Sequence, residues 1–445
     1  MKTKYFGLLF TANLTLAINS YSQMTLTGEV RPRSELRNGY QAPMDSVSKT
    51  SFFTSQRTKL NFGYTGEKYK IGVAIQDVSV WGTQSQSFSS YSPGAATFLH
   101  ESWGQYWFTP KLSAKVGRQA LSYDDERLFG ATLWNQQGRS HDVALIAFED
   151  TTLKLTIHGL SAYNANGIAN TANSYSVTNS YKTMQLLWAN KKLGPVSASL
   201  IFVNVGNQSP SGVNAARCFQ TAGTYLEFKK NALFISGRFY DQLSGKFSTP
   251  TFSATAKQMQ AWMAGVDVQY TLATKFMIGV GMEMMTGQSS TDTTTAYKET
   301  NHAFNPLFGT GHKFNGYMDY YFAGSGHNNQ GLQDIYLKLK YKQEKCSVGL
   351  DAHLFSATAN VLDKKNFAVN KTYKTLNSNL GTELDLTFTY NLNKAVALQA
   401  GYSYYLVTET TAAVKNIYKL DGTPDDRQPA SWAYLMLTFK PNFMK

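Results

Sequence analysis

Charged residues at every second position between residues 29 and 37 form a pattern that suits the binding of anions. They are Glu29, Arg31, Arg33, Glu35 and Arg37, and the spacing recurs at Arg57 and Lys59. A guanidinium group binds a carboxylate through two parallel hydrogen bonds, so a row of arginines offers successive sites to an acidic solute. The same side chains would also form an internal salt-bridge network with the two glutamates, and the sequence leaves both interpretations open.

A second group of charged residues lies between Gly117 and Asp142, where polar and apolar residues alternate poorly. Its members are Arg118, Asp124, Asp125, Glu126, Arg127 and Arg139. We predict a strand, an inward-folded loop over Ser122–Gly138 and another strand, with the opposed charges setting up a field across a constriction. A salt-bridge cluster that ties the loop to its surroundings is the alternative. Arg118 shares the register of the apolar residues before it, so a bulge or a membrane edge must intervene there.

Metal binding and catalysis find less support in the sequence. The consecutive acids at residues 124–126 cannot easily face one calcium ion, and His302, His312 and His327 match no zinc spacing. The run Ser-His-Asp at residues 140–142 cannot itself form a catalytic triad, because adjacent residues of a strand point to opposite faces. We therefore predict no metal, no cofactor and no enzyme activity. The alternative is a hydrolase that uses His141.

Strands must position these residues, because the sequence alternates with period two. Leu60, Phe62 and Tyr64 alternate with polar or small neighbours, and similar runs recur from Met24 to Phe439. Such strands have one apolar and one polar face. No later segment approaches the ~20 apolar residues that a membrane-spanning helix needs. Charged residues make up only 16% and aromatic residues 14% of the chain. We predict an all-β chain that forms one transmembrane antiparallel barrel with a polar lumen.

Seventeen connections divide the alternating runs, and short and long connections take turns. Eight are short, near Gly66–Lys68, Thr109–Lys111, Glu149–Thr151, Lys191–Pro195, Lys230–Asn231, Thr271–Lys275, Lys342–Lys345 and Asn391–Lys394. Nine are long and polar, near Asn38–Thr50, Gly82–Phe98, Ser122–Gly138, Asn164–Ser180, Asn207–Arg217, Ser244–Lys257, Ser289–Gln330, Ala357–Leu380 and Thr408–Ala430. About 18 strands follow, with short periplasmic turns and long outer loops. No repeated motif supports the soluble alternatives, a sandwich or a propeller.

The first 22 residues have the features of a signal peptide. Lys2 and Lys4 precede a mostly apolar run, and Ser20 and Ser22 place small residues before a cut at Gln23. We expect a secreted protein in which residues 23–445 form one barrel in a bacterial outer membrane, in contact with its lipid. A membrane anchor is the alternative interpretation of the same segment.

The mature chain is basic. Removing Lys2 and Lys4 lowers the basic count from 42 to 40, against 29 acidic residues. A positive balance favours an anionic partner, and for an exported barrel an acidic carbohydrate or another anionic solute is a better candidate than nucleic acid. Anionic lipid headgroups are the alternative. Cys218 and Cys346 fall near opposite ends of the predicted barrel, so we expect two unpaired thiols.

Several segments along the mature chain carry a family resemblance. They are Arg31–Glu35, Ser55–Arg57 with Leu60–Asn61, Gly117–Gln119, Tyr123–Leu128, Trp134–Asp142, Phe304–Thr310, His312–Tyr320 and Gly331–Asp334. These segments resemble the alginate-export family of outer-membrane barrels. The resemblance implies an 18-stranded barrel with an electropositive pore through which an anionic polysaccharide passes, although many members of that family are expected to carry other solutes.

These features predict an outer-membrane porin or transporter whose arginine-lined, electropositive lumen passes anionic solutes such as an acidic polysaccharide or oligosaccharide. The expected path residues are Arg31, Arg33, Arg37, Arg57, Lys59, Arg118, Asp124, Asp125, Arg127 and Arg139. The loops Ser122–Gly138 and Ser289–Gln330 are expected to narrow or gate the path. A plugged structural or accessory barrel in an envelope complex, with periplasmic or envelope partner proteins, is the alternative.

Overall fold

The computed structural model describes residues 23–83, 96–167, 177, 180–208, 216–244, 258–321, 326–427 and 430–444 of the chain. The predicted signal peptide, residues 1–22, lies outside the described residues, as do parts of several predicted outer loops. Cys218 and Cys346 are free thiols, as the sequence predicts.

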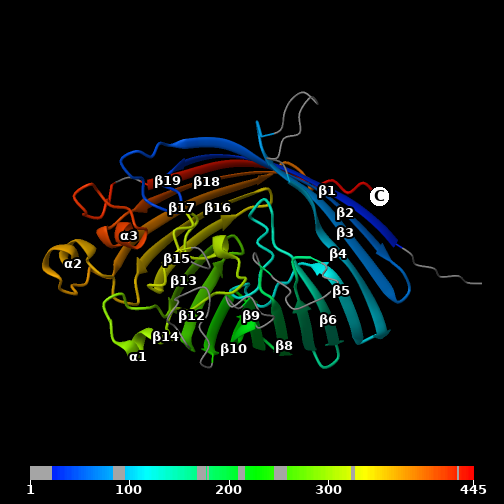
Figure 1. The fold of residues 1–445 in the computed structure, drawn as a ribbon. Helices are drawn as coiled ribbons and strands as arrows, with labels where there is room; N and C mark the ends of the chain where they lie inside the picture. Colours follow the sequence, from blue (N-terminus) through cyan, green and yellow to red (C-terminus); the bar gives the residue numbers. More distant parts are fainter. Residues whose placement is uncertain are drawn as a thin grey trace, which may run out of the picture.

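The alternating segments form long antiparallel strands that close into a single barrel (Figure 1). The strands are β1 (Gln23–Asn38), β2 (Ser51–Thr65), β3 (Tyr69–Val80), β4 (Ala96–Thr109), β5 (Leu112–Gln119), β6 (His141–Asp150), β7 (Leu155–Tyr163), β8 (Thr183–Leu193), β9 (Val196–Gln208), β10 (Ala216–Lys230), β11 (Leu233–Ser244), β12 (Gln258–Leu272), β13 (Phe276–Met285), β14 (Thr300–Asn301), β15 (Leu332–Lys342), β16 (Cys346–Ser356), β17 (Asn379–Asn391), β18 (Val396–Leu406) and β19 (Ala430–Phe439). Successive strands pair, β13 pairs with β15, and β19 pairs with β1 to close the circle. The two-residue β14 only pairs, in parallel, with the first two residues of β12, so 18 of the described strands form the wall, which confirms the predicted fold.

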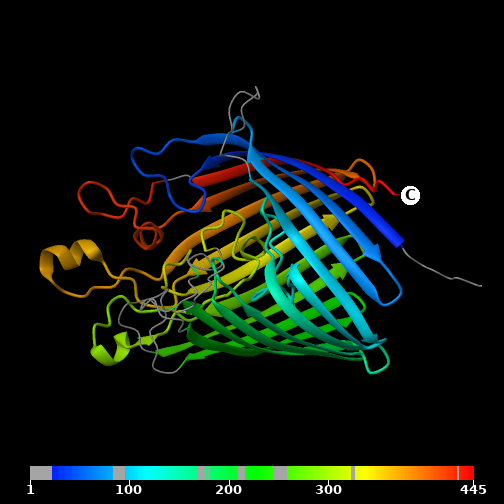
Figure 2. The same cartoon turned by 45° about the vertical axis from the view of Figure 1, so that its right-hand side comes forward.

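Short turns and long loops lie at opposite ends of the barrel (Figure 2). All eight predicted short turns connect neighbouring strands, and the C-terminus lies at the same end as these turns. The long loops at the other end carry α1 (Thr295–Lys298), α2 (Lys364–Asn370) and α3 (Glu409–Val414), and the 3₁₀ helix η1 (Gly311–Lys313) follows β14. The alternation of connection lengths thus correctly predicted that the short turns gather at one end of the barrel and the long connections at the other.

The outside of the wall is apolar because alternate residues of each strand point away from the lumen. In β2, Leu60 is 46% exposed whereas the inward-facing Arg57 is 4% exposed. Ile146 of β6, Val280 of β13 and Leu386 of β17 are exposed in the same way. This surface suits the lipid face of a barrel. None of the described helices is long and apolar enough to cross a membrane.

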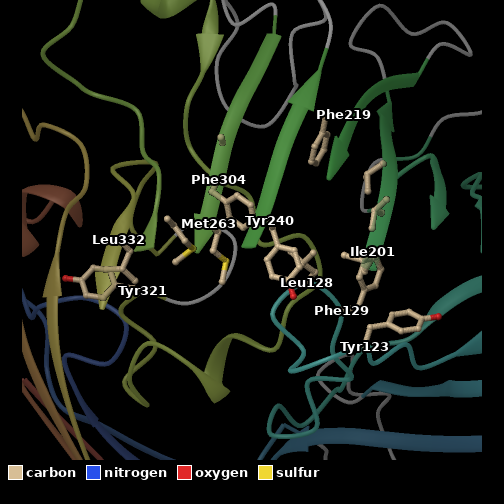
Figure 3. Packing of buried hydrophobic residues seen from close by; sticks show 14 of the residues in the cluster. Tyr123, Leu128, Phe129, Ile201, Phe219, Tyr240, Met263, Phe304, Tyr321 and Leu332 are labelled. Atoms are coloured by element: carbon tan, nitrogen blue, oxygen red, sulfur yellow. The ribbon is translucent and has the colours of Figure 1, made fainter. Parts of the chain in front are cut away.

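One side of the lumen wall is apolar, which corrects the prediction of a polar lumen throughout. Inward-facing Leu145 of β6, Leu186 of β8 and Val203 of β9 are buried inside the barrel. Two loops cover them, because Phe129 of the β5–β6 loop and Phe304 of the β13–β15 loop belong to the same buried cluster (Figure 3). Removing this apolar surface from water stabilises the folded-in loops.

Candidate functional site

Three arginines of β1 and β2 grip the inward-folded β5–β6 loop by its carbonyl groups, and we call Arg31, Arg33 and Arg57 the arginine clamp. Arg31 donates to the three carbonyl oxygens of residues 133–135 at 2.8–3.1 Å. Arg33 donates to the second of these oxygens at 3.0 Å, and Arg57 donates to three oxygens of residues 133–136 at 3.3–3.4 Å. The strand alternation places the clamp on one face, with Arg31 directly opposite Arg57.

Two glutamates on the same inner face balance the charge of the clamp. Glu29 lies 2.5 Å from Arg57 and 3.6 Å from Arg31, and Glu35 lies 2.9 Å from Arg33. All five side chains are buried. Because carbonyl and carboxylate oxygens occupy the guanidinium donors, the contacts agree with the salt-bridge interpretation of these residues. The clamp attaches a loop to the wall.

Arg37 and Lys59 flank the clamp and are more accessible. The Arg37 guanidinium pairs with Glu35 at 2.8 Å and lies 4.1 Å from the ring centre of Tyr40. Lys59 points into the lumen, is half-buried and forms no ion pair with any residue that the structure describes. Among the predicted path residues of the first two strands, Lys59 thus has an ammonium group that is open to the lumen and is not neutralised by a described carboxylate.

A buried ion cluster holds the other part of the β5–β6 loop. Glu283 of β13 accepts from Arg127 of the loop at 2.8 Å and from Arg238 of β11 at 2.9 Å. Arg238 also pairs with Asp267 of β12 at 2.5 Å, and Asp125 of the loop lies 3.7 Å from both arginines. Burial raises the pKa of the Asp125 carboxyl, and the two arginines oppose that rise. Arg127 and Asp125 thus belong to a closed cluster that ties the loop to the wall.

Replacing Glu283 by glutamine should destabilise the barrel by about 3–5 kcal/mol, because Arg127 and Arg238 would keep their buried charges without the shared partner. The measurement is urea unfolding in detergent or bilayers. Glu149→Gln is the matched control, because the Glu149 side chain is 62% exposed and pairs only loosely with His158. Equal loss of stability in the two variants would contradict the role of the cluster.

The β13–β15 loop is attached by carboxylates instead of arginines. The main-chain amides of Tyr317 and Met318 donate to Asp385 at 3.3 Å and to Glu383 at 2.6 Å, both on β17. Gly316 has a φ of 80°, and a Cβ at this position would lie 2.5 Å from the Glu383 carboxylate, so this tight turn requires glycine. The wall therefore holds carbonyls of one loop with arginines and amides of the other loop with carboxylates.

The acidic anchors Glu283, Glu383 and Asp385 are functional residues that the sequence reasoning missed. Each lies in the polar register of a strand, where any lumen-facing charge is allowed, so the alternation alone did not distinguish an anchor from a pore-lining residue. The long β13–β15 loop, rich in glycine and asparagine, was the available signal, because its main-chain and side-chain amides are donors that inward-facing carboxylates can anchor.

The two inward-folded loops meet inside the lumen. The Trp134 ring stacks on His312 at 4.5 Å and 5°, and the Arg33 guanidinium lies 4.7 Å from the Trp134 ring centre. Arg139 donates to the carbonyl oxygen of Gly309 at 3.1 Å. Arg139 therefore links the loops to each other, and no carboxylate of the described residues pairs with its guanidinium.

His327 gives the docking of the β13–β15 loop a pH dependence. The side chain is 3% exposed, and burial is the main cause that lowers its pKa to about 4. An unfolded loop binds the proton near pH 6.5, so docking is strongest above that pH and weakens down to pH 4, by on the order of 3 kcal/mol. Hydrogen exchange of residues 326–331, corrected for intrinsic rates, should accelerate over this range. His327→Asn cannot titrate and should show a flat profile; an equal pH response in this variant would contradict the assignment.

Arg118 does not join the constriction, which corrects that prediction. It pairs with Asp142 at 2.7 Å, and both side chains are about half exposed. Asp142 shares the outward register of the lipid-facing Ile146. Gly117 has a φ of 122°, which is unusual for a strand. This local distortion does not turn the Arg118 side chain towards the buried ion cluster of the β5–β6 loop. The predicted Asp124 lies elsewhere again, where it accepts a hydrogen bond from the Trp188 ring nitrogen at 3.0 Å.

The residues of the alternative catalytic site do not converge. The Ser140 hydroxyl lies 3.5 Å from His100, whereas His141 lies 3.1 Å from the Tyr181 hydroxyl. Asp142 points outwards to Arg118. Within the described ranges no group of three or more His, Cys, Asp or Glu residues could hold a metal ion.

Comparisons with known proteins establish the fold. No protein-family model and no curated protein matches the chain. Among solved structures, Acinetobacter baumannii OccAB4 is 11% identical, with 95% of this chain and 98% of that chain covered and a TM-score of 0.62. OccAB3 of the same organism and Pseudomonas aeruginosa OpdO are each 10% identical, with 95% of this chain and 100% and 98% of theirs covered and a TM-score of 0.60. These likenesses confirm the 18-stranded barrel and do not support the alginate-export family in particular.

Proposed function

We propose that the protein is an outer-membrane channel for small anionic solutes, with acidic oligosaccharides as the substrate class. An apolar outside that suits lipid and a fold shared with outer-membrane porins support this location and role. Such a channel needs several weak sites along its path, because one tight site would trap the solute.

The observation that carries the proposal is a set of lumen cations without carboxylate partners. Lys59 of β2, Lys70 of β3 and Lys115 of β5 face the lumen within four consecutive strands and form no ion pair with a described residue. Glu101 of β4 faces the lumen among them, whereas Glu29 of β1, directly opposite Lys59, is paired with Arg57. The path therefore follows these lysines, while the arginine clamp positions the loop that narrows it.

Cavities on both sides of the loops give room for a small solute. A cavity of about 500 Å³ is lined by His100, Arg139 and His141, and one of about 450 Å³ is lined by Lys70 and Asn61. Both fall in the range of about 300–1,000 Å³ that is usual for sites of small molecules. We infer that single sugar units or a thin extended oligosaccharide are the solutes that fit.

Single-channel recording of the purified protein in planar bilayers tests the proposal. We expect a conducting channel whose reversal potential in a KCl gradient has the sign of anion selectivity. Cation selectivity would overturn the basic path.

A second candidate, a plugged structural barrel, is favoured by the two loops anchored across the lumen. It predicts no conductance from the wild-type protein and a stable, folded barrel in lipid.

A further inference from the structure

A hollow in the lumen wall lies on the side of the β5–β6 loop that faces the short turns. Gly63 of β2 and Gly72 of β3 are directly opposite each other and both face inwards, so the wall lacks side chains there. Thr25, Asn61 and Lys70 line the resulting cavity of about 450 Å³. A Cβ on Gly63 would clash with the Thr25 hydroxyl, so the glycines make room for neighbouring side chains, and the cavity opens beside these side chains.

The indole ring of Trp103 forms one wall of this hollow. Trp103 pairs with Gly72 in the β3–β4 register, and a Cβ on Gly72 would lie 2.5 Å from the ring, so the ring occupies the space above this glycine. The indole nitrogen donates to Glu101 at 3.0 Å, which fixes the ring orientation. Lys115 places its ammonium 3.8 Å from the ring centre. Trp103 is half-buried, so part of the ring borders the cavity.

These groups match the chemistry of an acidic sugar. The apolar C–H face of a pyranose ring packs on an indole, while amide and hydroxyl side chains such as Asn61 and Thr25 bond sugar hydroxyls. Lys70 and Lys115 lie on either side of Trp103 and can neutralise a carboxylate. Glu101 accepts from the indole with one oxygen, which leaves the other for a sugar hydroxyl.

We propose that this hollow, lined by Gly63, Gly72, Trp103 and Lys70 and flanked by Lys115 on the Trp103 ring, is a subsite for one uronic acid unit of an oligosaccharide. The inference deepens the proposed function, on which it rests for the substrate class. The subsite lies beyond the constriction, because Gln76, the second inward residue of β3 after Gly72, already donates to the carbonyl oxygen of Gln137 in the loop at 2.7 Å. A solute that has passed the loop meets this hollow before the end of the barrel that carries the short turns.

Isothermal titration of the detergent-solubilised full barrel with trigalacturonate tests the subsite without requiring transport. Trp103→Ala should weaken binding about tenfold or more, and Lys115→Gln should weaken it by a similar factor. Trp81→Ala is the matched control, because Trp81 is 63% exposed and does not line the cavity. Neutral maltotriose should bind more weakly than the acidic trisaccharide and should not respond to Lys115→Gln.

Unchanged trigalacturonate affinity in Trp103→Ala, or equal affinity of the wild type for the neutral trisaccharide, would overturn the subsite. The circular dichroism spectrum of each variant shows that the barrel is folded. The proposed function fails separately: anion-selective conductance without trigalacturonate binding refutes the subsite alone, whereas binding without conductance supports the subsite and refutes transport.

Discussion

Replacing Arg31 and Arg57 together by alanine should raise the single-channel conductance several-fold and make the current noisier. These two side chains supply six hydrogen bonds to the carbonyl oxygens of residues 133–136. Hydrogen bonds to a charged group contribute about 1.5–3 kcal/mol each, so their loss loosens this part of the loop, which Arg33 and Gln76 then hold. The loosened loop widens the path and fluctuates during recording.

The control variants separate the clamp from a simple change of charge. Arg31→Lys with Arg57→Lys keeps both charges but loses the planar fork that reaches several carbonyls at once, so we expect an intermediate conductance. Lys154→Ala should leave conductance unchanged, because Lys154 is exposed in the short β6–β7 turn and lines neither of the two cavities beside the loop. If the double alanine variant conducts like the wild type and its loop stays resistant to protease, the clamp does not control the path.

Changing Lys59, Lys70 and Lys115 together to glutamate should reverse the ion selectivity of the channel. The three lysines point into the lumen from β2, β3 and β5 and have no ion-pair partner in the described chain, so their charges act on passing ions. A path lined by charges of one sign attracts ions of the opposite sign and repels ions of the same sign. The reversal potential in a KCl gradient should therefore change sign.

A charge-matched control distinguishes the path from the overall charge of the protein. Lys154, Lys275 and Lys345 are exposed within the short turns, and their replacement by glutamate changes the net charge equally. That variant should keep its anion selectivity. The effect of the lumen lysines should also shrink in 1 M salt, where the screening length is about 3 Å. Selectivity that changes to the same extent in both triple variants would refute the lysine path.

Much of the fold could be predicted because its determinants are local. The period-two pattern of Leu60, Phe62 and Tyr64 requires one apolar face, and in lipid that face must point outwards. Polar turns such as Gly66–Lys68 end each hairpin within a few residues. Closure of the barrel then follows, because an open sheet edge leaves backbone groups without hydrogen bonds in the bilayer.

The candidate site was predicted only in part. The alternation correctly placed Arg31, Arg33 and Arg57 on the inner face, but it did not say what they bind there. Their partners are main-chain carbonyls about a hundred residues away, as in the contact between Arg31 and Leu133. A carbonyl carries no side-chain signature, so no pattern of residue types indicates that it will accept a hydrogen bond from a distant arginine.

By itself, the sequence determined the class of fold, the number of strands, the ends of the hairpins and the inner face on which the charges of the first two strands lie, because these depend on neighbours along one strand. The tertiary structure alone decided which charges are occupied and which are free. Arg127 and Asp125 are enclosed because two loops fold onto an apolar part of the wall, whereas Lys59 remains accessible. That distinction depends on contacts between segments far apart in the chain, and burial and charge balance at those contacts determine it.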